Sequence, residues 1–206
     1  METFKSVFNN ENDYFSIVET YAVKYSLPPA LIMSIIAQES GFNPLKKRYE
    51  KKYDCYSYGL MQILYVTAKE NGFSDQPEEL LDINTNLDIS CKFLNKQYNR
   101  YAYNLTDTIS AYNGGSALLN PDNTYKNQDY VNKVLSYYLY YNAKFVELNE
   151  IKANKLATMI LNKQFDKIVS LNFSIINENS LINKNLLPLF VLIAIPLIAK
   201  IYKKVF

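Results

Sequence analysis

The sequence predicts a mainly α-helical domain. Apolar residues recur at helical spacing in several segments, and no segment alternates polar and apolar residues convincingly over the length of a strand. Turn-forming residues separate these segments, among them Asn-Gly at 71–72 and Asn-Gly-Gly at 113–115. The chain has 206 residues, of which 49% are hydrophobic and 20% charged, and this is enough for one domain with a full core and an appendage.

The predicted helices follow from these patterns in chain order. The first covers about residues 12–26, where apolar side chains share one face. The second opens at Leu-Pro-Pro-Ala (27–30), since proline is tolerated in a first helical turn, and it stops near Gly41. Residues 42–57 look like a polar loop, and further helices are expected over 58–71, 86–101, 106–113 and 126–148.

Three parts of the chain differ in composition. We assign residues 1–145 to a catalytic domain, 146–184 to a helical stalk or linker, and 185–206 to a hydrophobic C-terminal segment. The middle part is rich in lysine and asparagine and carries only a thin apolar stripe. It therefore either forms a stalk or packs back on the domain.

Glu39 interrupts the apolar stripe of the second predicted helix. Ile32, Ile35 and Ile36 repeat at helical spacing, and Glu39 occupies the next position on the same face. Burial disfavours the charged form of a carboxylate and raises its pKa. A carboxylic acid that stays protonated near neutral pH can donate a proton to a glycosidic oxygen. The pattern therefore makes Glu39 a candidate general acid.

The composition excludes several kinds of site. The chain has no histidine, which removes Ser-His and Cys-His nucleophilic catalysis and histidine-containing zinc sites. Two cysteines, Cys55 and Cys91, cannot form a four-thiolate metal site, and they either pair as a disulfide or remain buried free thiols. We expect no metal and no cofactor. The net charge of +2 gives no general reason to expect a nucleic acid partner.

Three further motifs carry polar side chains beside glycines or at helix ends. Residues 57–63 (SYGLMQI) place the Gln62 amide, which can bind sugar hydroxyls or N-acetyl groups, after a glycine that permits close backbone approach. Residues 111–115 (AYNGG) end a helix at a flexible turn, and residues 130–138 (YVNKVLSYY) open an amphipathic helix. Each has a structural explanation when taken alone, such as Ser57 capping a helix.

Taken in order, the motifs resemble the soluble lytic transglycosylase family, the goose-lysozyme-like branch of the lysozyme superfamily. The order is ESGFNP, SYGLMQI, NLDISCKFL (86–94), AYNGG and YVNKVLSYY, and the resemblance covers about residues 12–142. It implies a lysozyme-like α-helical fold and cleavage of the β-1,4 bond between N-acetylmuramic acid and N-acetylglucosamine in peptidoglycan. The family's single catalytic glutamate falls on Glu39. The positions that line its glycan groove fall on Ser57, Met61, Gln62, Tyr112, Asn113 and Tyr130.

The mechanism implied by the resemblance requires only one acid. Most glycosidases use two carboxylates, but no second acid lies in these motifs, since Asp82, Asp88 and Asp107 lie on helix flanks. In a lytic transglycosylase the one glutamate would protonate the leaving oxygen and then act as base toward the muramic acid C6 hydroxyl. That hydroxyl attacks C1 within the same sugar and gives a 1,6-anhydro product without consuming water. A hydrolytic muramidase and an inactive wall-binding structural component are the alternatives.

The sequence departs from the family pattern at two places. Residues 45–58 (LKKRYEKKYDCYSY) form a longer, basic and tyrosine-containing loop than is usual, which either contacts anionic wall polymer or a partner, or is a solvated insertion. The proline that usually follows the Gly-Leu-Met-Gln segment is absent, with Leu64 and Tyr65 in that region, and we expect only a small effect on a helix entry. Without tryptophan, sugar rings would stack on some of the 19 tyrosines.

The C-terminal segment predicts a transmembrane helix. Residues 186–199 (LLPLFVLIAIPLIA) are uninterrupted apolar residues, and Lys200, Lys203 and Lys204 follow. The run spans only about 21 Å against roughly 30 Å of hydrocarbon, which is also typical of a buried or interfacial helix. Its terminal place, its lack of a polar face and its basic flank favour a membrane anchor.

The location of the protein is predicted from the two chain ends. The N-terminus lacks the basic and apolar regions of a secretory signal peptide, so we do not expect one. We expect a phage virion, in an internal membrane or entry apparatus, with the bacterial cell envelope as the alternative. The expected partners are peptidoglycan strands, a membrane, and other proteins of a virion or envelope complex.

Overall fold

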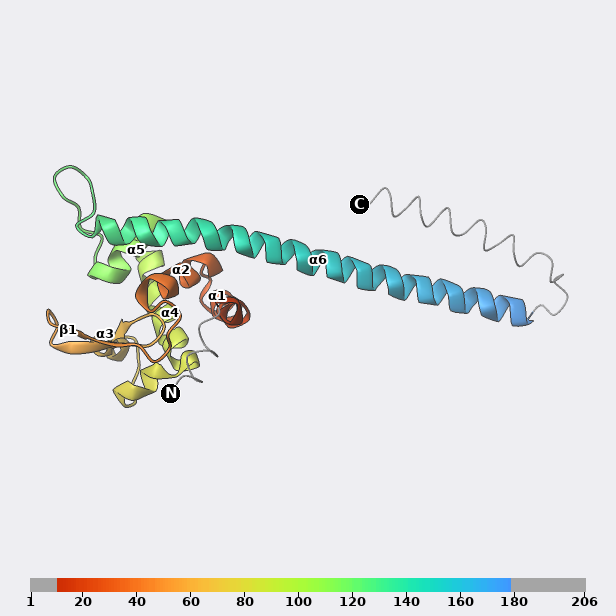
Figure 1. Ribbon diagram of the computed structural model, residues 1–206, viewed down its shortest axis with the longest axis horizontal. Helices are drawn as coiled ribbons and strands as arrows, with labels where there is room; N and C mark the ends of the chain where they lie inside the picture. The colour runs from red at the N-terminus through yellow and green to blue at the C-terminus, as the bar shows by residue number, and fades with distance from the viewer. Residues whose placement is uncertain (1–10, 179–206) are drawn as a thin grey trace. The chain divides into compact units, whose positions relative to one another are not determined.

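The computed structural model describes residues 11–178 (Figure 1). The chain divides into two units, one ending at Asn149 and the other beginning at Glu150. The prediction of a mainly helical fold is confirmed. The helices are two short 3-10 helices, η1 (Glu11–Tyr14) and η2 (Pro77–Leu81), and the α-helices α1 (Phe15–Tyr25), α2 (Pro29–Glu39), α3 (Tyr65–Glu70), α4 (Ile83–Arg100), α5 (Leu105–Gly114) and α6 (Gln128–Glu178).

Helix α2 forms the centre of the core. Its side chains from Ala30 to Ile36 are all buried and, apart from Ser34, apolar, so this stretch is buried on every side rather than on one stripe. Helices α1, α4, α5 and the first turns of α6 contribute to the same cluster of buried side chains. Each fully buried isoleucine or leucine stabilises the fold by about 1.5–3 kcal/mol relative to exposure. The end of α2, and with it Glu39, is therefore held rigidly.

Proline, glycine and capping side chains mark the ends of the helices. Proline opens α2, and Gly41, in a left-handed conformation with φ +61°, follows its last turn and donates to the Ile36 carbonyl over 3.1 Å. Asp82 caps α4 by accepting from the Thr85 amide over 2.8 Å, and Asn104 caps α5 in the same way.

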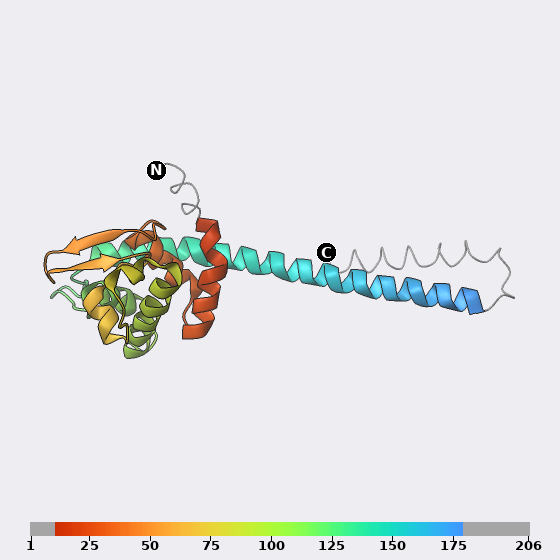
Figure 2. The same ribbon diagram turned by 90° about the horizontal axis from the view of Figure 1, so that it is seen from below.

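A small antiparallel sheet lies where the sequence predicted a polar loop and a helix (Figure 2). It consists of β1 (Lys47–Glu50), β2 (Cys55–Tyr58) and β3 (Ile63–Leu64), in the order β1-β2-β3. The predicted loop at 42–57 was therefore wrong where β1 and β2 form, and the predicted helix at 58–71 is confirmed only over α3. Three of the four β1 residues are exposed, so strand pairing rather than an apolar face stabilises β1, and periodicity gave no signal.

The turn between β2 and β3 is fixed by a buried asparagine. The Asn86 amide donates to the carbonyls of Tyr58 and Leu80 over 2.8 Å each, and its oxygen accepts from the Met61 amide over 2.9 Å. Gly59 passes directly against Asn86 at φ +73°. All three bonds are made by a side chain with no exposure, so the turn is strongly defined.

The two cysteines are free thiols. Cys91 is buried in α4 and Cys55 is partly buried in β2, so of the two alternatives from the sequence the structure has the unpaired one. Burial raises the pKa of the Cys91 thiol far above its usual range, which makes it unreactive.

The second unit is described as far as Glu178, the end of α6. Its apolar stripe residues, Ile151, Leu156, Met159 and Ile160, are exposed. No helix within residues 11–178 has a stretch long and apolar enough to cross a bilayer. The predicted membrane segment at 185–206 lies outside the described residues.

Replacing Gly59 with alanine should destabilise the fold by about 2 kcal/mol or more. A Cβ there would lie 2.2 Å from Asn86 Nδ2 and 2.5 Å from the Leu80 carbonyl oxygen. Gly41→Ala is the matched control, because its φ is also positive but nothing lies within 4 Å of the added Cβ. We expect only about 1 kcal/mol there, from backbone strain. Urea denaturation of both variants measures the difference, and equal losses would contradict the role of Asn86.

Candidate active site

A cavity of about 350 Å³ opens where the end of α2 meets the hairpin and helices α3 and α5. Five of the residues predicted from the sequence line it, namely Glu39, Ser57, Gln62, Tyr112 and Asn113. Met61 and Tyr130 are not among its lining residues. The remaining polar walls come from residues that the sequence did not single out, chiefly Arg48, Glu50 and Thr67. The cavity is therefore bounded by three separate motifs and the hairpin.

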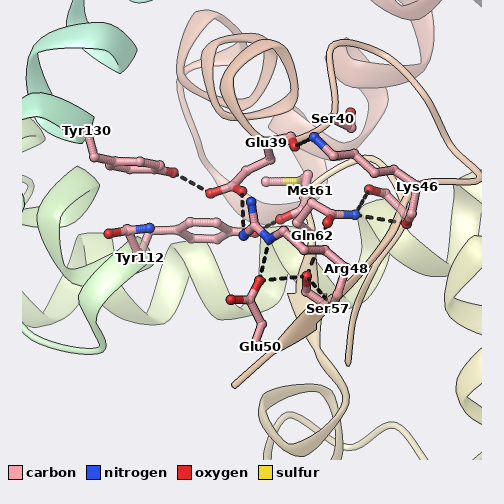
Figure 3. A network of polar contacts seen from close by, with 12 residues as sticks. Glu39, Ser40, Lys46, Arg48, Glu50, Ser57, Met61, Gln62, Tyr112 and Tyr130 are labelled. Atoms are coloured by element: carbon pink, nitrogen blue, oxygen red, sulfur yellow. Dashed lines mark hydrogen bonds and ion pairs between the residues drawn. The ribbon is translucent and has the colours of Figure 1, made fainter. Parts of the chain in front are cut away.

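Glu39 lies at the last position of α2, with its side chain almost fully buried (Figure 3). The Tyr130 hydroxyl of α6 donates a hydrogen bond to Glu39 Oε1 over 2.7 Å. Glu39 Oε2 lies 3.8 Å from Arg48 Nη2. Since Oε1 already accepts a hydrogen bond, Oε2 is the oxygen available to carry a proton.

Burial raises the pKa of Glu39 above its ordinary value. Desolvation is the largest cause and Glu50 adds to it, while the hydrogen bond from Tyr130 and the charges of Arg48 and Lys46 act in the opposite direction. The net shift is upward, so the Glu39 carboxyl keeps its proton to higher pH than an exposed glutamate does. Burial and the neighbouring Glu39 also raise the pKa of Tyr130 well above its usual range, so Tyr130 remains a hydrogen-bond donor.

The Gln62 side chain is used inside the protein. Its Nε2 donates to the carbonyls of Lys46 and Gly59 over 2.9 Å each, and its Oε1 accepts from the Ser57 hydroxyl over 3.1 Å. Gln62 itself has φ +48°, an uncommon conformation that these bonds stabilise. In this structure the amide joins the hairpin to the turn and both of its N–H groups are used inside the protein, while its binding of a sugar stays a prediction.

Tyr112 and Met61 form one structural pair. The Tyr112 hydroxyl donates to the Met61 carbonyl over 2.8 Å, and the Met61 side chain has no exposure. Tyr112 also packs against Phe93, with ring centroids 5.4 Å apart, so it forms a firm apolar wall of the cavity. Asn113 lines the cavity beside it and accepts from Asn127 Nδ2 over 2.9 Å.

Glu50 and Glu70 are carboxylates of the cavity that were not identified from the sequence, and Glu50 is the one paired with Arg48. Asp82, Asp88 and Asp107 have structural partners elsewhere, as expected of residues on helix flanks. Glu50 instead lines the same cavity as Glu39 and pairs with Arg48. The local sequence gave no signal for it, since the role of Glu50 follows from the strand, which puts Arg48 and Glu50 on one face.

Within residues 11–178, no three His, Cys, Asp or Glu side chains are grouped so that they could bind a metal ion. The chemical groups at the cavity are therefore the buried Glu39 carboxyl, which Tyr130 holds from outside the lining, the Arg48–Glu50 ion pair, and Glu70.

Comparison with known proteins gives consistent results. Residues 16–135 match the family model "Transglycosylase SLT domain". The chain is 31% identical over 117 residues to the membrane-bound lytic murein transglycosylase C of Photorhabdus laumondii. This match covers 50% of this chain and 31% of that protein. It is 35% identical over 134 residues to the membrane-bound lytic murein transglycosylase E of Buchnera aphidicola, covering 56% of each. The chain thus spans only part of the length of these relatives.

A solved structure shares the fold. It is that of a 70-kDa soluble lytic transglycosylase in complex with bulgecin A, with a TM-score of 0.55 and 25% sequence identity. The match covers 64% of this chain and 24% of the larger one.

Replacing Glu39 with glutamine should stabilise the fold increasingly as the pH rises. A buried acid with a raised pKa stabilises the native state fully only below the unfolded-state pKa, and that stability is lost as the pH rises toward the folded-state pKa. The gain in the free energy of unfolding over wild type should therefore grow from pH 4 to pH 7, by about 1.4 kcal/mol per unit of pKa shift. Urea denaturation across this pH range measures it, with Glu79→Gln in exposed η2 as the control. A constant difference would mean that Glu39 is not held in its protonated form.

Proposed function

Since the chain belongs to the transglycosylase SLT domain family, we propose that it is a peptidoglycan lytic transglycosylase with Glu39 as its acid and base. The single observation that carries the proposal is the Glu39 carboxyl, buried at the edge of a cavity, with a raised pKa and one oxygen held by Tyr130. A neutral acid in this setting can donate a proton to a glycosidic oxygen at neutral pH.

The proposed reaction starts when Glu39 Oε2 protonates the oxygen between N-acetylmuramic acid and N-acetylglucosamine. The C1–oxygen bond breaks, and the carboxylate that results is stabilised by Tyr130 and Arg48. The same carboxylate then accepts the proton of the muramic acid C6 hydroxyl as that oxygen bonds to C1. Glu39 ends protonated, and the product carries a 1,6-anhydro ring. The attacking hydroxyl belongs to the substrate, so proximity takes the place of a second carboxylate.

A hydrolytic muramidase is the second candidate, and Glu50 is the observation that favours it. A carboxylate in the same cavity as the acid could activate water, as in glycosidases with two carboxylates. Against this, Glu50 Oε1 is already engaged by the Arg48 guanidinium in a close ion pair.

Mass spectrometry of digested peptidoglycan tests the proposal. Wild type should release 1,6-anhydro-muropeptides, whose mass is lower than that of hydrolysis products by one water. Glu39→Gln should lower the rate by about 100-fold or more, because it removes general acid catalysis. Glu79→Gln, the exposed control, should match wild type. Reducing-end products would instead support the muramidase, and wall binding with equal inactivity of wild type and Glu39→Gln would support a structural component.

We also propose that residues 186–199 attach the protein to a membrane, since this apolar run is followed by three lysines within five residues, Lys200, Lys203 and Lys204. The names of the two bacterial relatives, both called membrane-bound, agree with this. The full chain should float with liposomes in a density gradient, whereas a chain ending at Lys184 should stay at the bottom. Flotation of both would contradict the proposal. A phage virion remains our proposed setting, to be tested by detecting the chain in purified particles.

A further inference from the structure

Arg48 and Glu50 share the face of β1 that borders the cavity. They are two residues apart on the strand, and Arg48 pairs across the hairpin with Ser57, which also lines the cavity. Lys47 and Tyr49 alternate with them. Lys47 Nζ lies over the Tyr56 ring at 4.7 Å, and Tyr49 packs on Tyr56, so this second pair of side chains is engaged with aromatic residues. The hairpin therefore presents one arginine and one glutamate to the cavity that holds Glu39.

The Arg48 guanidinium contacts two carboxylates unequally. Its Nε donates to Glu50 Oε1 in a close ion pair, while its Nη2 lies 3.8 Å from Glu39 Oε2, at the limit of an ion pair. A guanidinium bound closely to Glu39 would hold that acid in its charged form, which cannot donate a proton. In this arrangement Glu50 takes the better contact, and Glu39 keeps only the weaker one.

The position of Glu50 is itself fixed by the motif at 57–63. The Ser57 hydroxyl lies 3.1 Å from Gln62 Oε1, 3.2 Å from Glu50 Oε1 and 3.3 Å from the Arg48 carbonyl oxygen, and it can donate its single proton to one of these at a time. The Gln62 amide in turn bonds the Lys46 carbonyl at the start of the hairpin. These contacts connect β1 to the turn after β2, and Figure 3 shows them close to Glu39.

We propose that Arg48 and Glu50 are a positioning pair for the general acid: Glu50 restrains Arg48 from a full ion pair with Glu39, and so determines how readily Glu39 keeps its proton. This inference rests on the proposed function. It assigns a role to the hairpin, which the longer segment at 45–58 builds, and it requires neither residue to touch the reacting atoms.

The other groups around Glu39 cannot supply this control. Tyr130 from α6 and Tyr112 from α5 face it, and burial raises the pKa of both far above their usual range, so they stay neutral. Lys46 donates to the Glu39 backbone carbonyl rather than to its carboxyl group. The Lys46 charge also lowers the pKa of Glu39, but Lys46 is bound at the backbone. Among the described residues, Arg48 is the cation that contacts a carboxyl oxygen of Glu39, and Glu50 is the carboxylate paired with Arg48.

The proposal predicts opposite effects of two substitutions. Arg48→Gln removes a positive charge near Glu39, so Glu39 should hold its proton to higher pH. Glu50→Gln removes a negative charge and also frees Arg48 to move onto Glu39, so Glu39 should lose its proton at lower pH. Because catalysis needs protonated Glu39, the high-pH limb of kcat/KM should move up in the first variant and down in the second, by about one pH unit each.

The experiment measures kcat/KM against pH for the full-length chain on soluble glycan strands. Lys47→Gln is the matched control, because it removes a positive charge from the same strand but from the opposite face. The high-pH limb of kcat/KM should not move in this variant. Arg48→Lys keeps the charge, so its limb should lie nearer to wild type than that of Arg48→Gln. The double variant Arg48→Gln/Glu50→Gln should follow Arg48→Gln, since Glu50 acts mainly through Arg48.

The outcomes separate this proposal from the proposed function. If both single variants lose rate without moving the limb, or move it in the same direction, the positioning role is overturned while the transglycosylase assignment stands. If Glu39→Gln keeps wild-type activity, the proposed function itself fails. Thermal unfolding of each variant shows whether lost rate reflects lost folding. If Arg48→Gln does not fold, the other two variants decide. The high-pH limb of kcat/KM must then stay near that of wild type in Arg48→Lys and move to lower pH in Glu50→Gln.

Discussion

The structure depends on one costly placement, the burial of the Glu39 carboxyl at the end of an apolar helix. A buried charge is unfavourable, so the site favours the neutral acid and must satisfy it with hydrogen bonds. Tyr130 provides that bond from a helix 91 residues further along the chain. Helix α2 can hold this position because its side chains from Ala30 to Ile36 are all buried. The apolar core and the reactive group are therefore parts of the same element.

The hairpin and the turn after it are built around this acid. Asn86 and Gln62 use their amide groups to fix the turn, and Gln62 also bonds the start of β1. The polar side chains that look ready to bind a ligand in the sequence are thus largely occupied with each other. In the described structure they define where the cavity wall lies. Arg48 and Glu50, from the segment that departs from the family pattern, then face the acid.

The helices and the acid were predictable because they follow periodic burial. The stripe of Ile32, Ile35 and Ile36 predicts both the helix and the unusual place of Glu39, and Asn-Gly turns mark helix ends. The hairpin was not predictable in this way, because β1 buries almost nothing and is held by strand pairing and aromatic packing. For the same reason Glu50 was not identified from the sequence. Glu50 matters because it pairs with Arg48 beside Glu39, and the local sequence pattern does not indicate this contact.

The central claim is that Glu39 is a neutral acid near neutral pH, and its proton affinity can be measured directly. With ¹³C label in the glutamate side chains, NMR follows the Glu39 carboxyl carbon through a pH titration, and Glu39→Gln identifies the signal. The account predicts a pKa clearly above the ordinary value for glutamate, with the titration moved by changes at Arg48 and Glu50. A pKa at or below the ordinary value would contradict it, because the acid would then be charged in the free protein.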